Sequence, residues 1–222
     1  MKLRSKLKNS KLNYFKNIIQ IKNWANKKNS QNINNFMVKL QSSNFKIMRR
    51  KKMNLEKFIR DVNDFPKPGI IYKDITPALK NPETFKYIID KMAEIISEWN
   101  FDIVIGPESR GFIFAAPVAY KLNKELIPVR KPGKLPYKTL SVSYDLEYGS
   151  TALEIHVDAV EKGKKVVIVD DVLATGGTLE AIVKLVEKSG GEVVGIISLA
   201  ELTFLNPREK FKGIKIESLI NY

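Results

Sequence analysis

Cysteine is absent from the 222 residues, and histidine occurs only once, at position 156. Disulfide bonds, thiolate metal sites and cysteine nucleophiles are therefore excluded, and we expect a protein of the reducing cytoplasm. No apolar run approaches the length of a membrane span, and no secretory signal is visible near the N-terminus. We therefore expect no membrane partner.

Acidic residues are missing from residues 1–52, which carry fifteen Lys and Arg residues and ten Asn residues. The whole chain has 38 basic and 24 acidic residues, so residues 53–222 hold 23 basic and all 24 acidic ones and are nearly neutral. The positive charge thus belongs to the N-terminal extension, and no nucleic-acid partner is expected for the remainder. Three interpretations of the extension stay open: a disordered tail, an organelle-targeting leader, or a start codon assigned too early, with Met48 or Met53 as the true start. We favour the first or the third.

From residue 53 onward the pattern is that of an α/β domain. Helical spacing predicts a helix that begins after Asn54 and continues through Val62. Alternation predicts an exposed hairpin that projects as a flap, with strands over 139–144 and 152–157. The remaining strands are expected over 70–75, 101–105, 126–129, 166–169 and 192–200, and the remaining helices over 82–99, up to Leu122, and over 179–188. This repeated order predicts a mostly parallel, doubly wound sheet with helices on both faces.

The most informative stretch is VVIVDDVLATGGT, residues 166–178. A continuously apolar, mostly β-branched run predicts a buried strand, and two adjacent carboxylates, Asp170 and Asp171, follow it. Gly176 and Gly177 allow backbone N–H groups to approach an anion closely, and the start of the next helix adds a partial positive charge. Thr175 and Thr178 add hydroxyl donors. A phosphate therefore suits the loop.

The two carboxylates would repel that phosphate if they pointed at it. They suit neutral hydroxyl donors instead, such as the 2′- and 3′-hydroxyls of a ribose. The loop is no P-loop, because no Gly-Lys-Thr/Ser run completes it. The sequence thus predicts a pocket for a phosphorylated sugar at the carboxyl end of a parallel sheet.

Several further motifs occur in a fixed order with this run. Together they resemble the adenine phosphoribosyltransferases, a branch of the type I phosphoribosyltransferase family, and the resemblance covers almost all of 53–222. The matching segments are FPKPGI (65–70), KDITP (73–77), ESRGF (108–112), VRKPGKLP (129–136), SYDLEYG (143–149), the run 166–178, and ELT to REK (201–210). The resemblance implies the type I phosphoribosyltransferase fold and purine salvage, in which adenine and 5-phosphoribosyl 1-diphosphate form AMP and diphosphate.

The resemblance also implies roles for individual residues. The 5′-phosphate is expected on Ala174, Thr175, Gly176, Gly177 and Thr178, and the ribose hydroxyls near Asp170 and Asp171. Arg110 is expected to bind the diphosphate in a tight loop that carries an unusual cis peptide in the family; a guanidinium fork suits such an oxyanion. Arg130, Lys131 and Lys134 resemble residues that reach the diphosphate of a neighbouring subunit, which implies a homodimer. Without the resemblance, these three would equally be a solvated basic turn.

For the base, the resemblance assigns Ile71, Tyr72 and Lys73 to a hood over adenine and Leu202 to an apolar wall on its other side. Glu147 and Tyr148 match the catalytic flap, where a carboxyl can exchange a proton with the purine. Mg²⁺ is expected as cofactor, held mainly through diphosphate and ribose oxygens and not by a direct protein site.

Two other functions stay open. One is transfer to another purine, such as hypoxanthine, guanine or xanthine. The other is a DNA-binding regulator that senses phosphoribosyl diphosphate and uses the basic extension. No helix-turn-helix pattern is visible in that extension, and the core retains both Arg110 and Glu147, so an adenine-specific enzyme is favoured.

Overall fold

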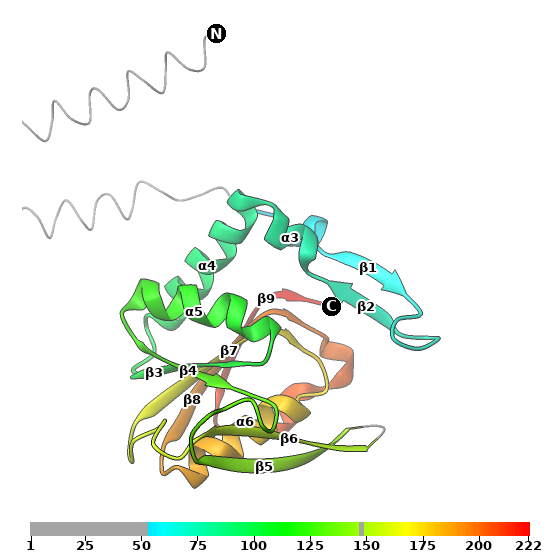
Figure 1. Cartoon of the computed structure of the whole chain (residues 1–222). Helices are drawn as coiled ribbons and strands as arrows, with labels where there is room; N and C mark the ends of the chain where they lie inside the picture. The colour runs from blue at the N-terminus through cyan, green and yellow to red at the C-terminus, as the bar shows by residue number, and fades with distance from the viewer. Residues whose placement is uncertain (1–52, 147–148) are drawn as a thin grey trace, which may run out of the picture. The chain divides into compact units, whose positions relative to one another are not determined.

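A five-stranded parallel sheet forms the centre of the molecule in the computed structural model, which describes residues 53–146 and 149–222 (Figure 1). The strands lie in the order β4-β3-β7-β8-β9, and each neighbouring pair is parallel. Their bounds are β3 Ile103–Pro107, β4 Glu125–Val129, β7 Lys165–Leu173, β8 Glu192–Glu201 and β9 Lys215–Asn221. The predicted parallel α/β sheet is confirmed. The sequence did not predict β9, an edge strand in which polar and apolar residues are mixed.

Alternating side chains of β7 divide the interior into two hydrophobic cores, one on each face of the sheet. Val167 and Val169 pack with α4 (Pro82–Ile96) and α5 (Arg110–Leu122), whereas Val166 and Ile168 pack with α6 (Gly177–Lys188). Figure 1 shows α4 and α5 on one side of the sheet and α6 on the other. Because both faces are covered, the central strands can be continuously apolar. The prediction of helices on both faces is thus confirmed.

The predicted hairpin is present as β5 (Thr139–Leu146) and β6 (Gly149–His156), paired antiparallel from Thr139 opposite His156 onward. It forms a two-stranded sheet of its own. The hairpin was predicted to project from the sheet, but part of it is buried: Val142, Leu153 and Ile155 lie in the same hydrophobic core as α6. The hairpin is therefore anchored in the core beside the start of α6.

The N-terminal part of the domain differs from the sequence prediction. The helix expected through Val62 ends at Phe58 as a single 3₁₀ turn, η1 (Leu55–Phe58), although Asn54 caps it as predicted. Arg60–Asn63 is a strand, β1, which pairs antiparallel with β2 (Ile71–Asp74). Opposite charges face each other across this pair, Arg60 with Asp74 and Asp61 with Lys73. Cross-strand ion pairs of this kind favour the hairpin over a longer helix.

The remaining elements are short connections: α3 (Thr76–Lys80), η2 (Thr203–Leu205) and η3 (Pro207–Lys210). Within residues 53–146 and 149–222, no helix is long and apolar enough to cross a membrane.

Candidate active site

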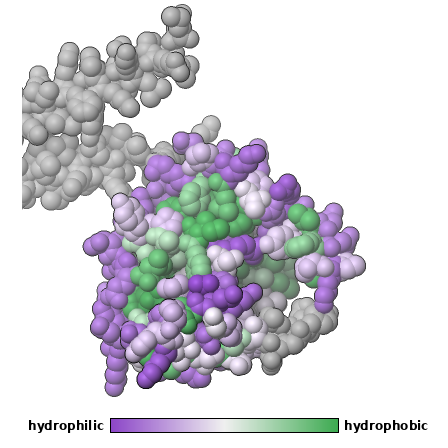
Figure 2. Space-filling view, viewed as in Figure 1, coloured by the Kyte–Doolittle hydropathy of each residue, from purple (hydrophilic) through white to green (hydrophobic). Residues whose placement is uncertain are grey.

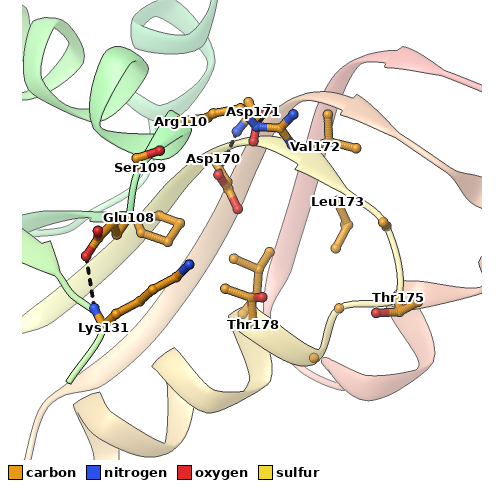
Figure 3. A pocket seen from close by; sticks show the side chains of 15 residues that line it. Glu108, Ser109, Arg110, Lys131, Asp170, Asp171, Val172, Leu173, Thr175 and Thr178 are labelled. Atoms are coloured by element: carbon orange, nitrogen blue, oxygen red, sulfur yellow. Dashed lines mark hydrogen bonds and ion pairs between the residues drawn. The ribbon is translucent and has the colours of Figure 1, made fainter. Parts of the chain in front are cut away.

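A cavity of about 340 Å³ opens at the carboxyl ends of β3 and β7 (Figure 3). Three segments supply its walls: the turn between β3 and α5, the end of β7 with the loop before α6, and the residue after Arg130 in the β4–β5 connection. Adjacent parallel strands that lead into helices leave such a crevice, and ligands of α/β proteins bind there. The lining residues are Pro107, Glu108, Ser109, Arg110, Lys131 and the continuous run 170–179.

The loop before α6 has the geometry of an anion site. Gly176 adopts φ +81°, a left-handed conformation that favours glycine, and α6 begins at the next residue. No side chain among the described residues caps this helix start. The Thr178 hydroxyl lies 3.4 Å from the Tyr144 hydroxyl, which ties the loop to β5. The first backbone N–H groups and the positive end of the helix dipole are thus available to a phosphate.

Asp170 and Asp171 are both buried at the end of β7, with 7% and 3% of their surface exposed. Asp170 Oδ1 accepts a hydrogen bond from the Asp171 backbone N–H at 2.8 Å. Burial and the neighbouring Asp171 charge raise the pKa of Asp170 well above its usual value. Burial also raises the pKa of Asp171, although Arg110 opposes this rise. Both carboxyls line the cavity and are kept from water, so a hydroxyl donor or a cation in the cavity would stabilise their ionised forms.

Arg110 faces this pair from the start of α5 (Figure 3). Its Nε lies 2.7 Å from Asp171 Oδ2, an ion pair whose angles do not make a hydrogen bond, since Oδ2 has no hydrogen-bond partner within the described residues. The Arg110 side chain is 37% exposed, so its guanidinium also reaches the open side of the cavity. Its exposed part is therefore accessible from the cavity, and binding of the diphosphate by Arg110 stays a prediction.

The turn that positions Arg110 has a cis peptide bond between Glu108 and Ser109, as the resemblance implied. A Cβ on Gly111 would lie 2.5 Å from the Pro107 ring and 2.9 Å from Asp170 Oδ1, so only glycine allows the turn to approach β7. The sequence analysis did not assign Gly111 to the site. Its signal was its place directly after Arg110 in a matching motif.

Glu108 is a second residue that the sequence analysis left out of the site. Its Oε2 accepts hydrogen bonds from the Lys131 backbone N–H at 3.0 Å and from Arg130 Nε at 2.9 Å. These donors, Lys131 first, lower the pKa of Glu108. Glu108 thereby fixes the basic turn beside the cavity of the same chain. Lys131 lines that cavity and Lys134 is exposed. The expectation that Arg130, Lys131 and Lys134 reach the diphosphate of a neighbouring subunit stays a prediction.

The hood residues lie beside the cavity and not on its lining. Tyr72 has its ring 5.2 Å from the Arg110 guanidinium carbon and packs edge-on against Phe65 at 5.1 Å. Ile71 is 54% exposed. Lys73 instead pairs with Asp61, Nζ to Oδ1 2.7 Å.

Leu202 is half-buried, and its backbone N–H donates to Leu173 O at 2.9 Å, which places it next to the end of β7. Glu147 and Tyr148, expected on the flap, lie outside the described residues. The structure therefore brings together the sugar-phosphate loop, the carboxyl pair, Arg110 and Lys131, with Tyr72 at the rim.

Comparisons with known proteins agree with this arrangement. The family described as "Phosphoribosyl transferase domain" matches residues 76–213. The adenine phosphoribosyltransferase of Petrotoga mobilis is 64% identical over 170 residues, which are 77% of this chain and 98% of that protein. A crystal structure of adenine phosphoribosyltransferase from Thermoanaerobacter pseudethanolicus superposes with a TM-score of 0.74 and 55% identity, covering 76% of this chain and 98% of that one. The enzyme of Saccharomyces cerevisiae, complexed with an imino-altritol bisphosphate and adenine, gives a TM-score of 0.70 at 36% identity, covering 74% and 96%.

Proposed function

Because this chain belongs to the adenine phosphoribosyltransferase family, we infer that it transfers the 5-phosphoribosyl group of 5-phosphoribosyl 1-diphosphate to adenine, with AMP and diphosphate as products. This is a purine-salvage reaction. The main support for the inference is that the glycine-rich loop before α6, two buried carboxyls and an arginine line the same cavity.

The sugar is the part of the substrate that the cavity fits best. We propose that residues 174–178 hold the 5′-phosphate through backbone N–H groups and the hydroxyls of Thr175 and Thr178. Asp170 and Asp171 then accept hydrogen bonds from the ribose hydroxyls, which lie one sugar ring away from that phosphate. Two neutral donors satisfy the buried carboxyls without a second buried charge, which removes part of the burial penalty seen in their raised pKa values.

The leaving group is proposed to lie on Arg110 and Lys131. Breaking the bond between C1 of the ribose and the diphosphate oxygen develops positive charge on the sugar and negative charge on the diphosphate. Cations fixed beside the leaving group stabilise that charge separation, and positioning supplies much of the remaining rate. Arg110 can leave its ion pair with Asp171 for the diphosphate once a ribose hydroxyl donates to that carboxylate.

Mg²⁺ is proposed as the cofactor. Among residues 53–146 and 149–222, no group of three or more His, Asp or Glu side chains is arranged to hold a metal. Mg²⁺ commonly keeps several waters and binds through one or two carboxylates together with substrate phosphates. Asp170 and Asp171 line the cavity in which such an ion would lie, and diphosphate and ribose oxygens would supply most of its ligands. The ion would neutralise charge on the diphosphate.

The purine is proposed to lie between the hood, Ile71, Tyr72 and Lys73, and the wall formed by Leu202. Glu147 on the flap would exchange a proton with the base, and Tyr148 would cover it. This selectivity is tested by comparing rates with adenine, hypoxanthine and guanine at saturating 5-phosphoribosyl 1-diphosphate. We expect kcat/KM to be highest for adenine; faster turnover of hypoxanthine would contradict the assignment.

A homodimer is proposed from the exposed side chains near the edge of the sheet. Strand β4 is an edge strand, and Leu126 on it is 45% exposed. Ile113 and Tyr120 on α5 are 39% and 89% exposed, and Tyr137 beyond the basic turn is 56% exposed. Figure 2 shows hydrophobic surface on the side of the molecule where α4 and α5 lie. Light scattering should give twice the mass of one chain. The double variant Tyr120→Glu with Leu126→Glu should reduce the measured mass to that of a single chain.

Residues 53–222 are proposed as the catalytic unit. The relative from Petrotoga mobilis matches over 170 residues, which are 98% of its own length. A chain of residues 53–222 should therefore retain the full rate of AMP formation. The lack of cysteine is compatible with the reducing cytoplasm, which we propose as its compartment. Sequence-specific DNA binding by the full chain without any AMP formation would instead favour the regulator.

A further inference from the structure

Tyr222, the residue after β9, holds the β1–β2 hairpin to the rest of the domain. Lys73 Nζ lies 3.9 Å from the centre of the Tyr222 ring, and the same ammonium pairs with Asp61 at 2.7 Å. The Lys73 side chain is only 12% exposed, so this contact is largely shielded from water. A cation over an aromatic face attracts more strongly when it is desolvated. In Figure 1 the C-terminal end of the chain lies beside β2.

The backbone of Tyr222 fixes a second segment at the same time. Its N–H donates to Glu201 O at 2.9 Å, and its carbonyl accepts from the Thr203 N–H at 2.9 Å and from the Thr203 hydroxyl. These hydrogen bonds bracket Leu202 on both sides. Leu202 itself donates to Leu173 O at 2.9 Å, at the end of β7. One residue therefore connects β2 to the segment that follows β8.

We propose that Tyr222 is a positioning residue for the purine. Its ring fixes the hood through Lys73, and its backbone fixes Leu202, so the two sides of the base site keep their separation. The inference rests on the proposed function, because it assigns the base to the space between these two segments. Tyr222 is not among the residues that line the sugar-phosphate cavity, so it acts through Lys73 and Leu202.

The ring face, and not the hydroxyl, carries this role. Burial, followed by the nearby carboxylates of Asp61 and Glu56, raises the pKa of Tyr222 above its usual value. The hydroxyl is therefore neutral at physiological pH. Phenylalanine keeps the ring face that Lys73 contacts, whereas leucine keeps apolar bulk but loses the ring.

The test compares Tyr222→Leu, Tyr222→Phe and Lys73→Met in the full chain, with Asp61→Asn as a control for the ion pair between Lys73 and Asp61, whose Asp61 side chain is 55% exposed. Initial rates are measured as a function of adenine concentration at saturating 5-phosphoribosyl 1-diphosphate, and as a function of 5-phosphoribosyl 1-diphosphate concentration at saturating adenine. Tyr222→Leu and Lys73→Met should each raise the KM for adenine roughly threefold to tenfold, the size expected for one partly buried cation–π contact. The KM for 5-phosphoribosyl 1-diphosphate should stay within twofold of the wild-type value, and Tyr222→Phe should resemble the wild type. The double variant Tyr222→Leu with Lys73→Met should raise the KM for adenine little more than either single variant does, because both remove the same contact.

Amide hydrogen exchange supplies a readout that needs no activity. Tyr222→Leu should speed exchange over residues 60–74 and leave residues 166–173 unchanged. Unchanged exchange in the hairpin, an equal rise in both KM values, or a Tyr222→Phe variant as impaired as Tyr222→Leu would each overturn the inference. A wild-type chain that forms no AMP would overturn the proposed function alone, and the exchange result would still decide whether Tyr222 holds the hairpin.

Discussion

Replacing Arg110 separates two roles of this residue: it is the partner of a buried carboxylate in the structure, and it is the proposed ligand for the leaving group. Arg110→Met removes the cation next to Asp171, whose side chain is only 4% exposed. An unsatisfied buried polar group costs about 1–3 kcal/mol. Since the Arg110 side chain is 37% exposed, solvent already screens part of the attraction and the lower half of that range is expected. For a domain of this size, 1 kcal/mol corresponds to roughly 2–4 °C in Tm.

The pH dependence of this loss has a definite sign. Without Arg110 the pKa of Asp171 rises further, because burial already raises it and the guanidinium opposes the rise. A carboxyl whose folded-state pKa exceeds its unfolded-state value lowers stability above the folded-state pKa. This penalty disappears as the pH falls toward the unfolded value. The deficit of Arg110→Met should therefore shrink as the pH is lowered from neutral toward the ordinary pKa of an aspartate side chain.

The activity should fall much more than the stability. Loss of one charged group beside a departing oxyanion typically costs about 10²–10³-fold in rate. We expect that loss in kcat/KM for 5-phosphoribosyl 1-diphosphate, measured as AMP formation at a temperature where the variant is folded. Arg110→Lys keeps the charge without the fork and should lie between the two.

The double variant Arg110→Met with Asp171→Asn is the decisive control. It removes both the cation and the carboxylate that needs it, so Tm should return toward that of the wild type. Activity should stay low. Recovery of activity in the double variant, or wild-type kcat/KM in Arg110→Met, would refute the assignment of Arg110 to the diphosphate.

Three further variants test other parts of the site. Asp170→Asn with Asp171→Asn should raise the KM for 5-phosphoribosyl 1-diphosphate at least tenfold without lowering Tm at neutral pH, because burial disfavours the two charges that it removes; an unchanged KM would remove the ribose role. Glu147→Gln should lower kcat about 10²-fold and change the KM for adenine less, and an unaltered kcat would exclude proton exchange by this residue. Arg208→Ala should cost about 2–3 kcal/mol in unfolding experiments, because buried Glu201 loses two hydrogen bonds of 2.7 Å. Arg208 lowers the pKa of Glu201, so the wild-type advantage should be present at neutral pH and fade below about pH 4.5, the ordinary pKa of a glutamate side chain. The exposed Glu209→Ala should show neither effect.

The cavity wall formed by residues 170–178 was predictable because its geometry is local. In residues 166–178, a buried strand, a carboxyl pair and a glycine turn follow one another without a gap, so the order along the chain is also the order in space. Gly176 has the left-handed φ that the sequence suggested, and α6 begins directly after it at Gly177, two residues before the predicted start at Leu179.

The parts that depend on distant partners were not predictable. Apolar residues at helical spacing near Val62 predicted a helix, but pairing with β2 makes Arg60–Asn63 a strand. In the sequence Glu108 is an ordinary carboxylate in a turn, and its hydrogen bonds with Arg130 and Lys131 are apparent only in the folded chain. The contacts of the Lys73 ammonium with Asp61 and Tyr222 likewise join residues from different parts of the chain. Each of these outcomes depends on which segments meet, and that is a property of the tertiary fold.

The parallel pairing of β3 with β7 has a consequence for how the enzyme acquires activity. Both strands supply cavity walls, yet the hydrogen bond from Lys165 N–H to Asp102 Oδ2, directly before their paired residues, joins positions 63 apart in the sequence. Contacts of such long sequence separation close large loops and form slowly during folding. No partly folded chain that lacks this pairing can present Arg110 to Asp171. Recovery of AMP formation after dilution from denaturant should therefore lag behind the recovery of helical circular dichroism, and catalysis would report on completion of the central sheet.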